Sequence, residues 1–369
     1  MAIGSSEIGG GQKVFLTYIK EYLKRGYSVD ITLPAGPLAE RIKAYDCPMH
    51  LIDLSSPLCL LAIAKIIRQG HYDIINTFLT KCSLLISLVN LWFRVPLCCT
   101  LLNAITRENL GMIQKRIYPL FYFLLNKMSR GIIVNSEQNK KHYIEVAKMN
   151  ENTVEVIYSG IDVDEFLSRS GCEPSGDKYV IGAVGRLSDE KGHIYLLRAL
   201  KHINDMDFEC LIVGDGPLRS RLESYVRNEG LIEKVRFLGF QDHVAAIMSR
   251  MDIVVMPSLS ETFGITIIEA FVLRKLVIAS AVGGIPELVK NNITGFLYPA
   301  KDSLALAETI KYAYRHKFKV EQIVNSAFAF AMTSFTGAVM AENTLSYYDA
   351  LCRRKQLPNQ KTNERRGLR

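Results

Sequence analysis

Short apolar runs alternate with longer amphipathic stretches along most of the chain. The runs have the length of strands and are rich in β-branched residues, and the stretches between them repeat their apolar positions at helical spacing. The predicted strands are residues 28–33, 74–78, 97–101, 132–135, 154–158, 180–184, 209–213, 253–256 and 276–280. Strands that alternate with helices usually pair in parallel sheets. The pattern therefore predicts an α/β protein.

A polar, glycine-bearing stretch at residues 168–177 separates two halves with this pattern. The chain has 369 residues, which suits two domains better than one. We therefore expect a domain over residues 1–167, a linker over residues 168–177 and a second domain over residues 178–334. Each half is predicted to form a doubly wound parallel sheet, with a cleft between the two.

The charge of the chain is concentrated at its end. The net charge is +8, and residues 353–369 hold seven Lys or Arg and one acid, so the remaining residues carry only +2. A nucleic-acid-binding protein should spread its basic residues over a folded face, so that class is disfavoured. We expect residues 353–369 to be a disordered basic tail that either solubilises the protein or contacts anionic lipid.

Other bulk features favour a cytoplasmic protein. The longest apolar runs, residues 84–93 and 117–125, are interrupted and too short to span a membrane, and the start shows no secretory signal. Eight cysteines are scattered without metal-ligand spacing, so buried thiols are expected and a metal site is not. Residues 117–125 follow Lys115 and Arg116 and suggest either peripheral contact with the inner face of a membrane or a buried helix, which is the simpler interpretation.

The richest chemistry lies in residues 257–287. Glu261 and Glu269 are separated by seven residues and bracket a helix predicted to begin near Gly264. Free backbone N–H groups at a helix start bind anions, and a flanking carboxylate can hold sugar hydroxyls. A second strand and a Gly283-Gly284 turn follow. Loops at the carboxyl ends of neighbouring parallel strands are where open α/β sheets bind ligands.

The paired glutamates, Phe263-Gly264 between them and the Gly-Gly-x-Pro-Glu turn that ends at Glu287 resemble the donor-binding core of the family 4 glycosyltransferases. The resemblance implies the GT-B fold, in which two Rossmann-like domains face a cleft and a last helix, here about residues 335–352, crosses back to the first domain. It also implies retaining transfer of a hexosyl or N-acetylhexosaminyl group from a nucleotide diphosphate sugar, with a UDP-sugar favoured over a GDP-sugar. The implied acceptor is a cell-surface or lipid-linked glycan, as in polysaccharide or lipopolysaccharide synthesis, and no metal or other cofactor is implied.

Residues 185–192 follow a predicted strand and resemble the family's phosphate-gripping loop. Arg186 and Lys191 would neutralise the diphosphate, because arginine suits contact with several oxygens and lysine acts as a point charge. With Glu261, which would orient the sugar, they are the expected catalytic residues, and Glu269 would hold the ribose. Taken alone, the loop could equally be a surface loop with two solvated cations.

The resemblance extends the donor site to further residues. Glycines of a loop that opens a helix over residues 13–25 would let the backbone approach the donor, and the turn at residue 214 and the segment ending at residue 240 would lie near the nucleotide. The additional donor-binding candidates are Gly10, Gly11, Gly214, Phe240, Phe263, Gly264 and Ile265. His193 follows the phosphate loop, and we expect it to lie on the surface.

Three departures from the family pattern concern the acceptor side and one helix end. Only residues 1–3 are available for the first strand, Leu102 stands where many relatives have a histidine, and the glycine usual after the helix of Glu269 is replaced within residues 271–276. Asn103 is the one acceptor-binding candidate, and it could equally be a turn residue. Two rival hypotheses stay open: a non-catalytic subunit that binds sugar nucleotides, and a GT-B epimerase or phosphorylase.

Overall fold

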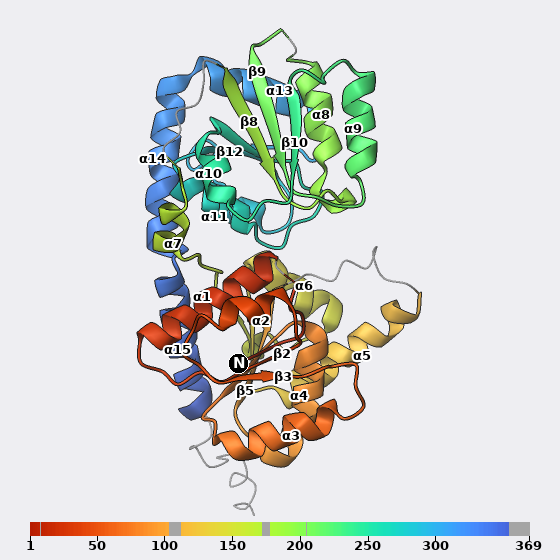
Figure 1. The fold of residues 1–369 in the computed structure, drawn as a ribbon, viewed down its shortest axis with the longest axis vertical. Helices are drawn as coiled ribbons and strands as arrows, with labels where there is room; N and C mark the ends of the chain where they lie inside the picture. Colours follow the sequence, from red (N-terminus) through yellow and green to blue (C-terminus); the bar gives the residue numbers. More distant parts are fainter. Residues whose placement is uncertain (8, 103–111, 172–177, 204, 354–369) are drawn as a thin grey trace, which may run out of the picture. The chain divides into compact units, whose positions relative to one another are not determined.

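The computed structural model describes residues 1–7, 9–102, 112–171, 178–203 and 205–353, and for residues 112–119 it describes the backbone only. These residues form two sheets in which every recorded strand pair is parallel (Figure 1). The first sheet has the order β3-β2-β1-β4-β5-β6-β7 and the second the order β10-β9-β8-β11-β12-β13. The predicted α/β class with two Rossmann-like domains is confirmed.

The first domain contains the shorter strands. Its strands are β1 (Ala2–Ile3), β2 (Ile31–Leu33), β3 (Met49–Leu51), β4 (Ile75–Phe78), β5 (Leu97–Leu101), β6 (Gly131–Val134) and β7 (Val154–Val156). Its helices are α1 (Gly10–Lys24), α2 (Pro37–Ile42), α3 (Cys59–Gly70), α4 (Thr80–Phe93), α5 (Met112–Met128) and α6 (Glu137–Ala147). The two-residue strand β1 is an interior strand of the sheet, where it pairs with β2 and β4, and both of its residues are buried.

The second domain has a more regular sheet. Its strands are β8 (Tyr179–Val184), β9 (Phe208–Val213), β10 (Val235–Gly239), β11 (Ile253–Met256), β12 (Leu276–Ser280) and β13 (Phe296–Tyr298). Its helices are α7 (Val163–Ser168), α8 (His193–Lys201), α9 (Arg219–Asn228), α10 (Val244–Ser249), α11 (Ile265–Val272), α12 (Ile285–Leu288), α13 (Ser303–Arg315) and α14 (Lys317–Ser334). Hydrophobic clusters cover both faces of this sheet, as expected for a parallel sheet whose strands are apolar runs.

The chain divides into two compact units between Ile157 and Tyr158 and again between Val339 and Met340. Residues 136–139 are grouped with the second unit. The chain thus passes from the first unit to the second before α7, whereas the sequence suggested a linker at residues 168–177. Residues 172–177 of that stretch lie outside the described part. The expected basic tail, apart from Arg353, also lies outside it.

The last helix, α15 (Gly337–Arg353), returns to the first unit, as the resemblance implied. The hydroxyls of Tyr18 and Thr344 are 3.1 Å apart, and the Tyr347 hydroxyl donates to the Thr153 carbonyl at 3.1 Å. Tyr347 and Leu351 also lie against Gly131, where a Cβ would come within 2.7 Å of both side chains. These contacts fix α15 on the first sheet beside β6.

Candidate active site

The loops that follow the strands of the second sheet meet at its carboxyl edge and are joined through their backbones. The loops after β8, β9, β10, β11 and β12 take part. The bonds run from Gly185 N to Val213 O, Leu187 N to Asp215 O, Gly214 N to Gly239 O, Leu259 N to Glu190 O and Gly284 N to Glu261 O, with lengths of 2.8–3.0 Å. We call this set of loops the rim; its described segments are residues 185–192, 214–218, 257–264 and 281–284.

Glycines let the rim loops stack backbone on backbone. A Cβ at Gly214 would lie 2.0 Å from the Gly185 carbonyl oxygen, and one at Gly283 would lie 1.8 Å from the Glu261 oxygen. Gly283 also has a φ of +54°, in the left-handed region that favours glycine. The Gly283-Gly284 turn therefore fixes the position of the backbone that carries Glu261.

Lys191 and Glu261 meet across the rim. The Lys191 Nζ is 2.5 Å from Glu261 Oε2, and the two side chains are 26% and 12% exposed. Lys191 comes from the loop after β8 and Glu261 from the loop after β11, seventy residues apart. The structure thus brings together two of the three catalytic candidates in a partly buried ion pair.

Arg186, the third catalytic candidate, is exposed at the start of the same loop as Lys191. Its guanidinium makes no hydrogen bond or ion pair with any residue that the structure describes, and the structure places it in contact with neither Lys191 nor Glu261. A solvated guanidinium beside a rim of backbone N–H groups can receive an anionic ligand without first losing a protein partner.

The helix predicted at Gly264 is α11, and Gly264 is its N-cap with a φ of +104°. No side chain caps this end, and Ile265 and Thr266 in its first turn are half-buried. An uncapped helix start with free N–H groups is suited to an anion. Glu269 lies one turn further, and its side chain is only 3% exposed.

Phe263 lies in the hydrophobic core behind the rim. Its ring stacks on Tyr158, with ring centroids 5.6 Å apart, and contacts Phe335 edge-on at 5.8 Å. The ring is 1% exposed. Phe263, an expected donor-binding residue, is therefore enclosed, and its ring holds the loop that carries Glu261 against the segments at Tyr158 and Phe335.

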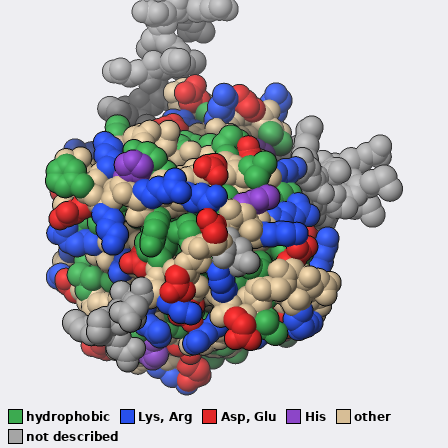
Figure 2. Space-filling view, turned by 90° about the horizontal axis from the view of Figure 1, so that it is seen from above, with side chains coloured by type: hydrophobic (Ala, Val, Ile, Leu, Met, Phe, Trp, Pro, Cys, Tyr) green, Lys and Arg blue, Asp and Glu red, His purple; other side chains and the backbone are tan. Residues whose placement is uncertain are grey.

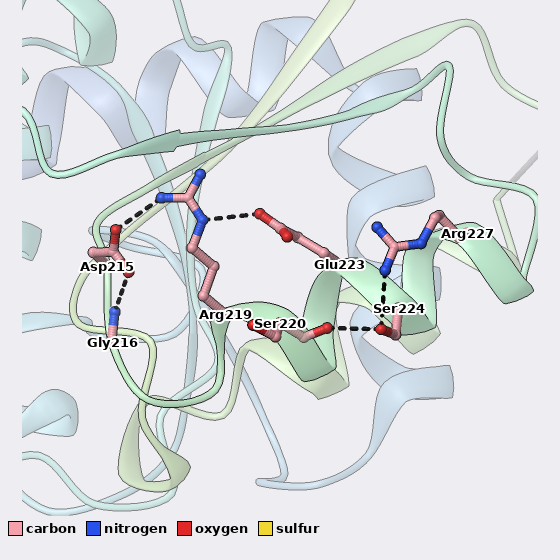
Figure 3. A network of polar contacts seen from close by, with 7 residues as sticks. All are labelled: Asp215, Gly216, Arg219, Ser220, Glu223, Ser224 and Arg227. Carbon is pink, nitrogen blue, oxygen red and sulfur yellow. Dashed lines mark hydrogen bonds and ion pairs between the residues drawn. The ribbon is translucent and has the colours of Figure 1, made fainter.

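An ion-pair network that the sequence analysis missed supports the turn at Gly214 (Figure 3). Arg219 contacts Asp215 Oδ2 at 2.7 Å through Nη1 and Glu223 Oε1 at 2.8 Å through Nε, and Asp215 Oδ1 accepts the Gly216 N–H at 2.7 Å. The Gly216 N–H and then Arg219 lower the pKa of the Asp215 carboxyl below its usual value. The sequence signal for this network is the spacing of Asp215, Arg219 and Glu223, whose alternating charges stand four residues apart.

The end of β10 lies beside this network. A Cβ at Gly239 would come 3.2 Å from Arg219 Nη1, and Phe240, the next residue, is 61% exposed. Phe240 is thus an apolar ring presented at the edge of the rim, where the sequence placed a base-binding segment.

The expectation that His193 lies on the surface was wrong. The side chain is 3% exposed, and its Nδ1 has no hydrogen-bond partner among the described residues. Burial, with a smaller contribution from the Lys191 charge, lowers the pKa of His193 to about 4. Gly192, the residue before His193, packs against the loop after β11: a Cβ at Gly192 would lie 2.0 Å from the Pro257 carbonyl oxygen. Helix α8 therefore begins against the rim, and its first residue, His193, is enclosed.

The candidates of the first domain lie at the start of α1. Gly10 is exposed and has no atom within 4 Å of the position of a Cβ, whereas a Cβ at Gly11 would lie 3.7 Å from the Leu102 side chain. Leu102 is buried. The acceptor candidate Asn103 lies outside the described residues.

The part of the chain that the structure describes contains no group of three or more His, Cys, Asp or Glu side chains that could hold a metal ion. Five of the eight cysteines are buried as free thiols, four of them in the first domain. Burial raises the pKa of the Cys82 thiol to about 12, and it also raises the pKa values of the Cys98 and Cys210 thiols. These groups are structural, because a thiol that stays protonated is a poor nucleophile and a poor metal ligand.

A two-domain Rossmann-like architecture with an ion-paired rim on its second sheet agrees with the family comparisons. The profile for Glycosyltransferase Family 4 matches residues 8–165, and the profile for Glycosyl transferases group 1 matches residues 165–329. The chain therefore belongs to family 4 of the glycosyltransferases and has the GT-B fold.

Individual relatives have diverse activities. An uncharacterized glycosyltransferase of Methanocaldococcus jannaschii is 31% identical over 247 residues, which are 63% of each chain. The D-inositol 3-phosphate glycosyltransferase of Mycobacterium marinum is 26% identical, over 81% of this chain and 72% of its own length. The UDP-Gal:alpha-D-GlcNAc-diphosphoundecaprenol alpha-1,3-galactosyltransferase of Escherichia coli is 25% identical, over 80% of this chain and 82% of its own length.

Solved structures agree with the fold. Anabaena HepE, crystallised in complex with UDP, superposes with a TM-score of 0.82 at 24% identity, over 95% of this chain and 98% of its own. A glycosyltransferase from Rickettsia africae gives a TM-score of 0.82 at 24% identity, over 95% of this chain and 97% of its own.

Proposed function

We propose that this protein is a retaining glycosyltransferase that moves a hexosyl or N-acetylhexosaminyl group from a nucleotide diphosphate sugar to a lipid-linked or cell-surface glycan. A UDP-sugar is favoured over a GDP-sugar, because the Escherichia coli relative, similar over most of both chains, is named for a UDP-sugar donor. That relative is also named for a lipid diphosphate acceptor, which supports a lipid-linked acceptor here. The single observation that carries the proposal is the Lys191–Glu261 ion pair beside the uncapped start of α11.

The rim offers separate groups for the two ends of the donor. The diphosphate would be neutralised by Arg186, by Lys191 and by the N–H groups at Ile265 and Thr266. Glu261, relieved of its lysine partner as the phosphate takes the ammonium, would accept hydrogen bonds from the sugar hydroxyls. Glu269 would hold the ribose hydroxyls from the second turn of α11.

The transfer step would use the same groups. The bond between the anomeric carbon and the leaving phosphate oxygen breaks, and the acceptor oxygen bonds to that carbon on the same face. The proton of the acceptor hydroxyl passes to an oxygen of the departing phosphate, whose basicity rises as the bond breaks. Lys191, which is partly buried, and Arg186, which is exposed, stabilise the growing charge on that phosphate, and the partly buried charge acts more strongly than it would in water. No metal ion is needed in this scheme.

Titration calorimetry with uridine, UMP and UDP tests the phosphate role. Arg186→Ala and Lys191→Ala should weaken binding of UDP by about ten-fold or more and leave uridine nearly unchanged. Equal losses for all three ligands would contradict the assignment. Transfer to extracted lipid-linked acceptors, measured with and without EDTA, then separates the enzyme from a subunit that only binds donor and tests the metal-independent scheme.

A further inference from the structure

We propose that the outer face of helices α3, α4 and α5 is a docking surface for anionic phospholipid. This inference rests on the proposed function, because an enzyme that acts on a lipid-linked acceptor must work at a bilayer. The three helices lie side by side, with α4 in contact with both neighbours (Figure 1). Their inner side chains join one hydrophobic cluster on the same face of the first sheet, so their outer sides form one continuous surface.

Large apolar side chains cover this outer surface on all three helices. On α4, Leu88, Leu91 and Trp92 are exposed, and Trp92 is 81% exposed. Leu58, the N-cap of α3, and Leu61 one turn later are exposed on the neighbouring helix. A monomeric soluble protein seldom leaves several large apolar side chains together in water, so their grouping points to something that covers them.

The third helix corrects the sequence-based interpretation of residues 117–125. A simple buried helix was favoured there, but α5 is amphipathic: Tyr122 and Leu125 are buried while Leu120, Phe123 and Leu124 are exposed. The exposed residues are spaced as i, i+3 and i+4, which places them on one side of the helix. The Lys127 ammonium lies 5.6 Å from the centre of the Phe123 ring, so cation and ring share this side.

Charge decides what the surface binds. The sequences of α3, α4 and α5 contain no Asp or Glu, whereas exposed basic residues stand among the apolar ones: Lys65 and Arg68 on α3, Lys81 on α4 and Lys127 on α5. Exposed apolar side chains mixed with cations of one sign are complementary to a bilayer that presents acyl chains beneath anionic headgroups. A homodimer would instead bring these cations against one another.

The contact is peripheral in this proposal. No helix in the described part of the chain is both long and apolar enough to cross a membrane. Trp92, an amphipathic ring at the end of α4, suits the boundary between headgroups and acyl chains, and the lysine stems can lie along the surface while their ammonium groups reach the headgroups. Another face of the molecule has a different character: the face drawn in Figure 2 shows basic and acidic side chains interspersed.

The chain supplies its own reporter, because Trp92 is its single tryptophan. The full-length protein is titrated with vesicles in which about one lipid in three is phosphatidylglycerol and the rest phosphatidylcholine. We expect the Trp92 emission to shift to the blue and to be quenched by lipids brominated in the acyl chain, with binding that weakens as salt is raised. Vesicle binding without any change in Trp92 emission would place the contact elsewhere and overturn the proposal.

Variants test each helix while Trp92 stays in place. Leu88→Glu with Leu91→Glu, Leu61→Glu and Phe123→Glu should each weaken vesicle binding about ten-fold or more. The matched control is Phe318→Glu at the start of α14 in the second domain, which is 75% exposed and should leave vesicle binding unchanged. Equal loss in the control, or no loss in the helix variants, would refute a specific surface.

Two further readouts separate the alternatives. If a second copy of the chain covers the surface, light scattering will show a dimer and Trp92 emission will depend on protein concentration without vesicles, which contradicts lipid docking. UDP binding by calorimetry distinguishes this inference from the proposed function. A helix variant that loses vesicle binding should keep UDP binding, while a protein that binds vesicles through Trp92 but neither binds UDP nor transfers sugar would refute the proposed function alone.

Discussion

The two domains share one architecture but differ in where their charged, buried polar and exposed apolar groups gather. The second domain keeps apolar residues on both faces of its sheet and gathers charge at the rim, where Lys191 and Glu261 pair. The first domain buries polar groups within its central strands, among them Asn76, Thr77 and Thr100, and exposes large apolar side chains on α3, α4 and α5. The contrast teaches that one architecture can gather charge in the loops at the strand ends of one domain and group exposed apolar side chains on the outer helices of the other.

The largest expected effect falls on the rim ion pair. Glu261→Ala and Lys191→Ala should each lower kcat/KM by roughly 10²- to 10³-fold, equivalent to about 3 to 4 kcal/mol, because a charge that acts in the transition state is lost. The measurement is initial-rate transfer with the correct donor and acceptor. The matched control is Lys201→Ala, which breaks the 2.5 Å surface pair with Glu229 in the same domain. If the control loses as much activity as the rim variants, the loss does not come from a catalytic role of the Lys191–Glu261 pair.

The Gly283-Gly284 turn tests whether the rim depends on backbone contact. Gly283→Ala should destabilise the protein by about 2 to 4 kcal/mol, since the new Cβ meets the Glu261 carbonyl oxygen in a left-handed conformation. Gly230→Ala is the control, because Gly230 has a φ of +68° but nothing within 4 Å of its Cβ position. It should lose only about 1 kcal/mol in urea unfolding. Similar losses for the two variants would mean that strain alone, not the rim contact, matters at Gly283.

Buried His193 makes the stability of the second domain depend on pH. Its pKa in the folded protein is about 4, below the ordinary value of 6.5, so below pH 6.5 the unfolded chain takes up a proton that the folded chain does not. The free energy of unfolding is therefore nearly independent of His193 above pH 6.5, and it decreases as the pH falls from 6.5 toward 4. Between pH 7 and pH 5 the wild type should lose about 2 kcal/mol more than His193→Asn in urea unfolding. His202→Asn, at an exposed histidine after the same helix, should behave as the wild type.

The buried polar layer of the first domain is the counterpart of the rim. Thr100 Oγ1 donates to Asn76 Oδ1 at 2.9 Å, and Asn76 is 2% exposed. Thr100→Val should cost about 1 to 2 kcal/mol, because it leaves a buried amide oxygen without its donor. Thr100→Ser keeps the hydroxyl and should cost less. A valine variant as stable as the wild type would show that this layer contributes nothing to the difference between the domains.

The smallest effect is expected at Arg274, which lies within residues 271–276, where the glycine usual in the family is replaced. Its φ is +54°, while its guanidinium lies 3.8 Å from the centre of the Phe328 ring and bonds Asn325 at 2.7 Å. Arg274→Gly removes strain and contacts together, so it should stay within about 1 kcal/mol of the wild type. Arg274→Ala keeps the strain and loses the contacts, so its melting temperature should be the lowest of the three. If Arg274→Gly melts below Arg274→Ala, the strain relieved by glycine is smaller than the extra backbone entropy that glycine loses on folding.

The return of the last helix to the first domain was implied by the resemblance to the family. The sequence by itself determined the alternation of strands and helices, the class of fold and the helix start at Gly264. Each of these follows from local periodicity, or from a motif whose residues are close together in the chain. The assignment of Lys191 and Glu261 to one site came from a resemblance, because nothing in their spacing along the sequence shows that they meet.

Only the tertiary structure decided which groups are buried and which surfaces are free. His193 is enclosed because Gly192 lets α8 begin against Pro257, and the Phe263 ring lies in the core because Tyr158 and Phe335, distant in sequence, close over it. In the same way, Leu61, Trp92 and Phe123 form one outer surface only because α3, α4 and α5 lie side by side. Burial and adjacency depend on contacts between residues far apart in the chain, and a local pattern does not carry that information.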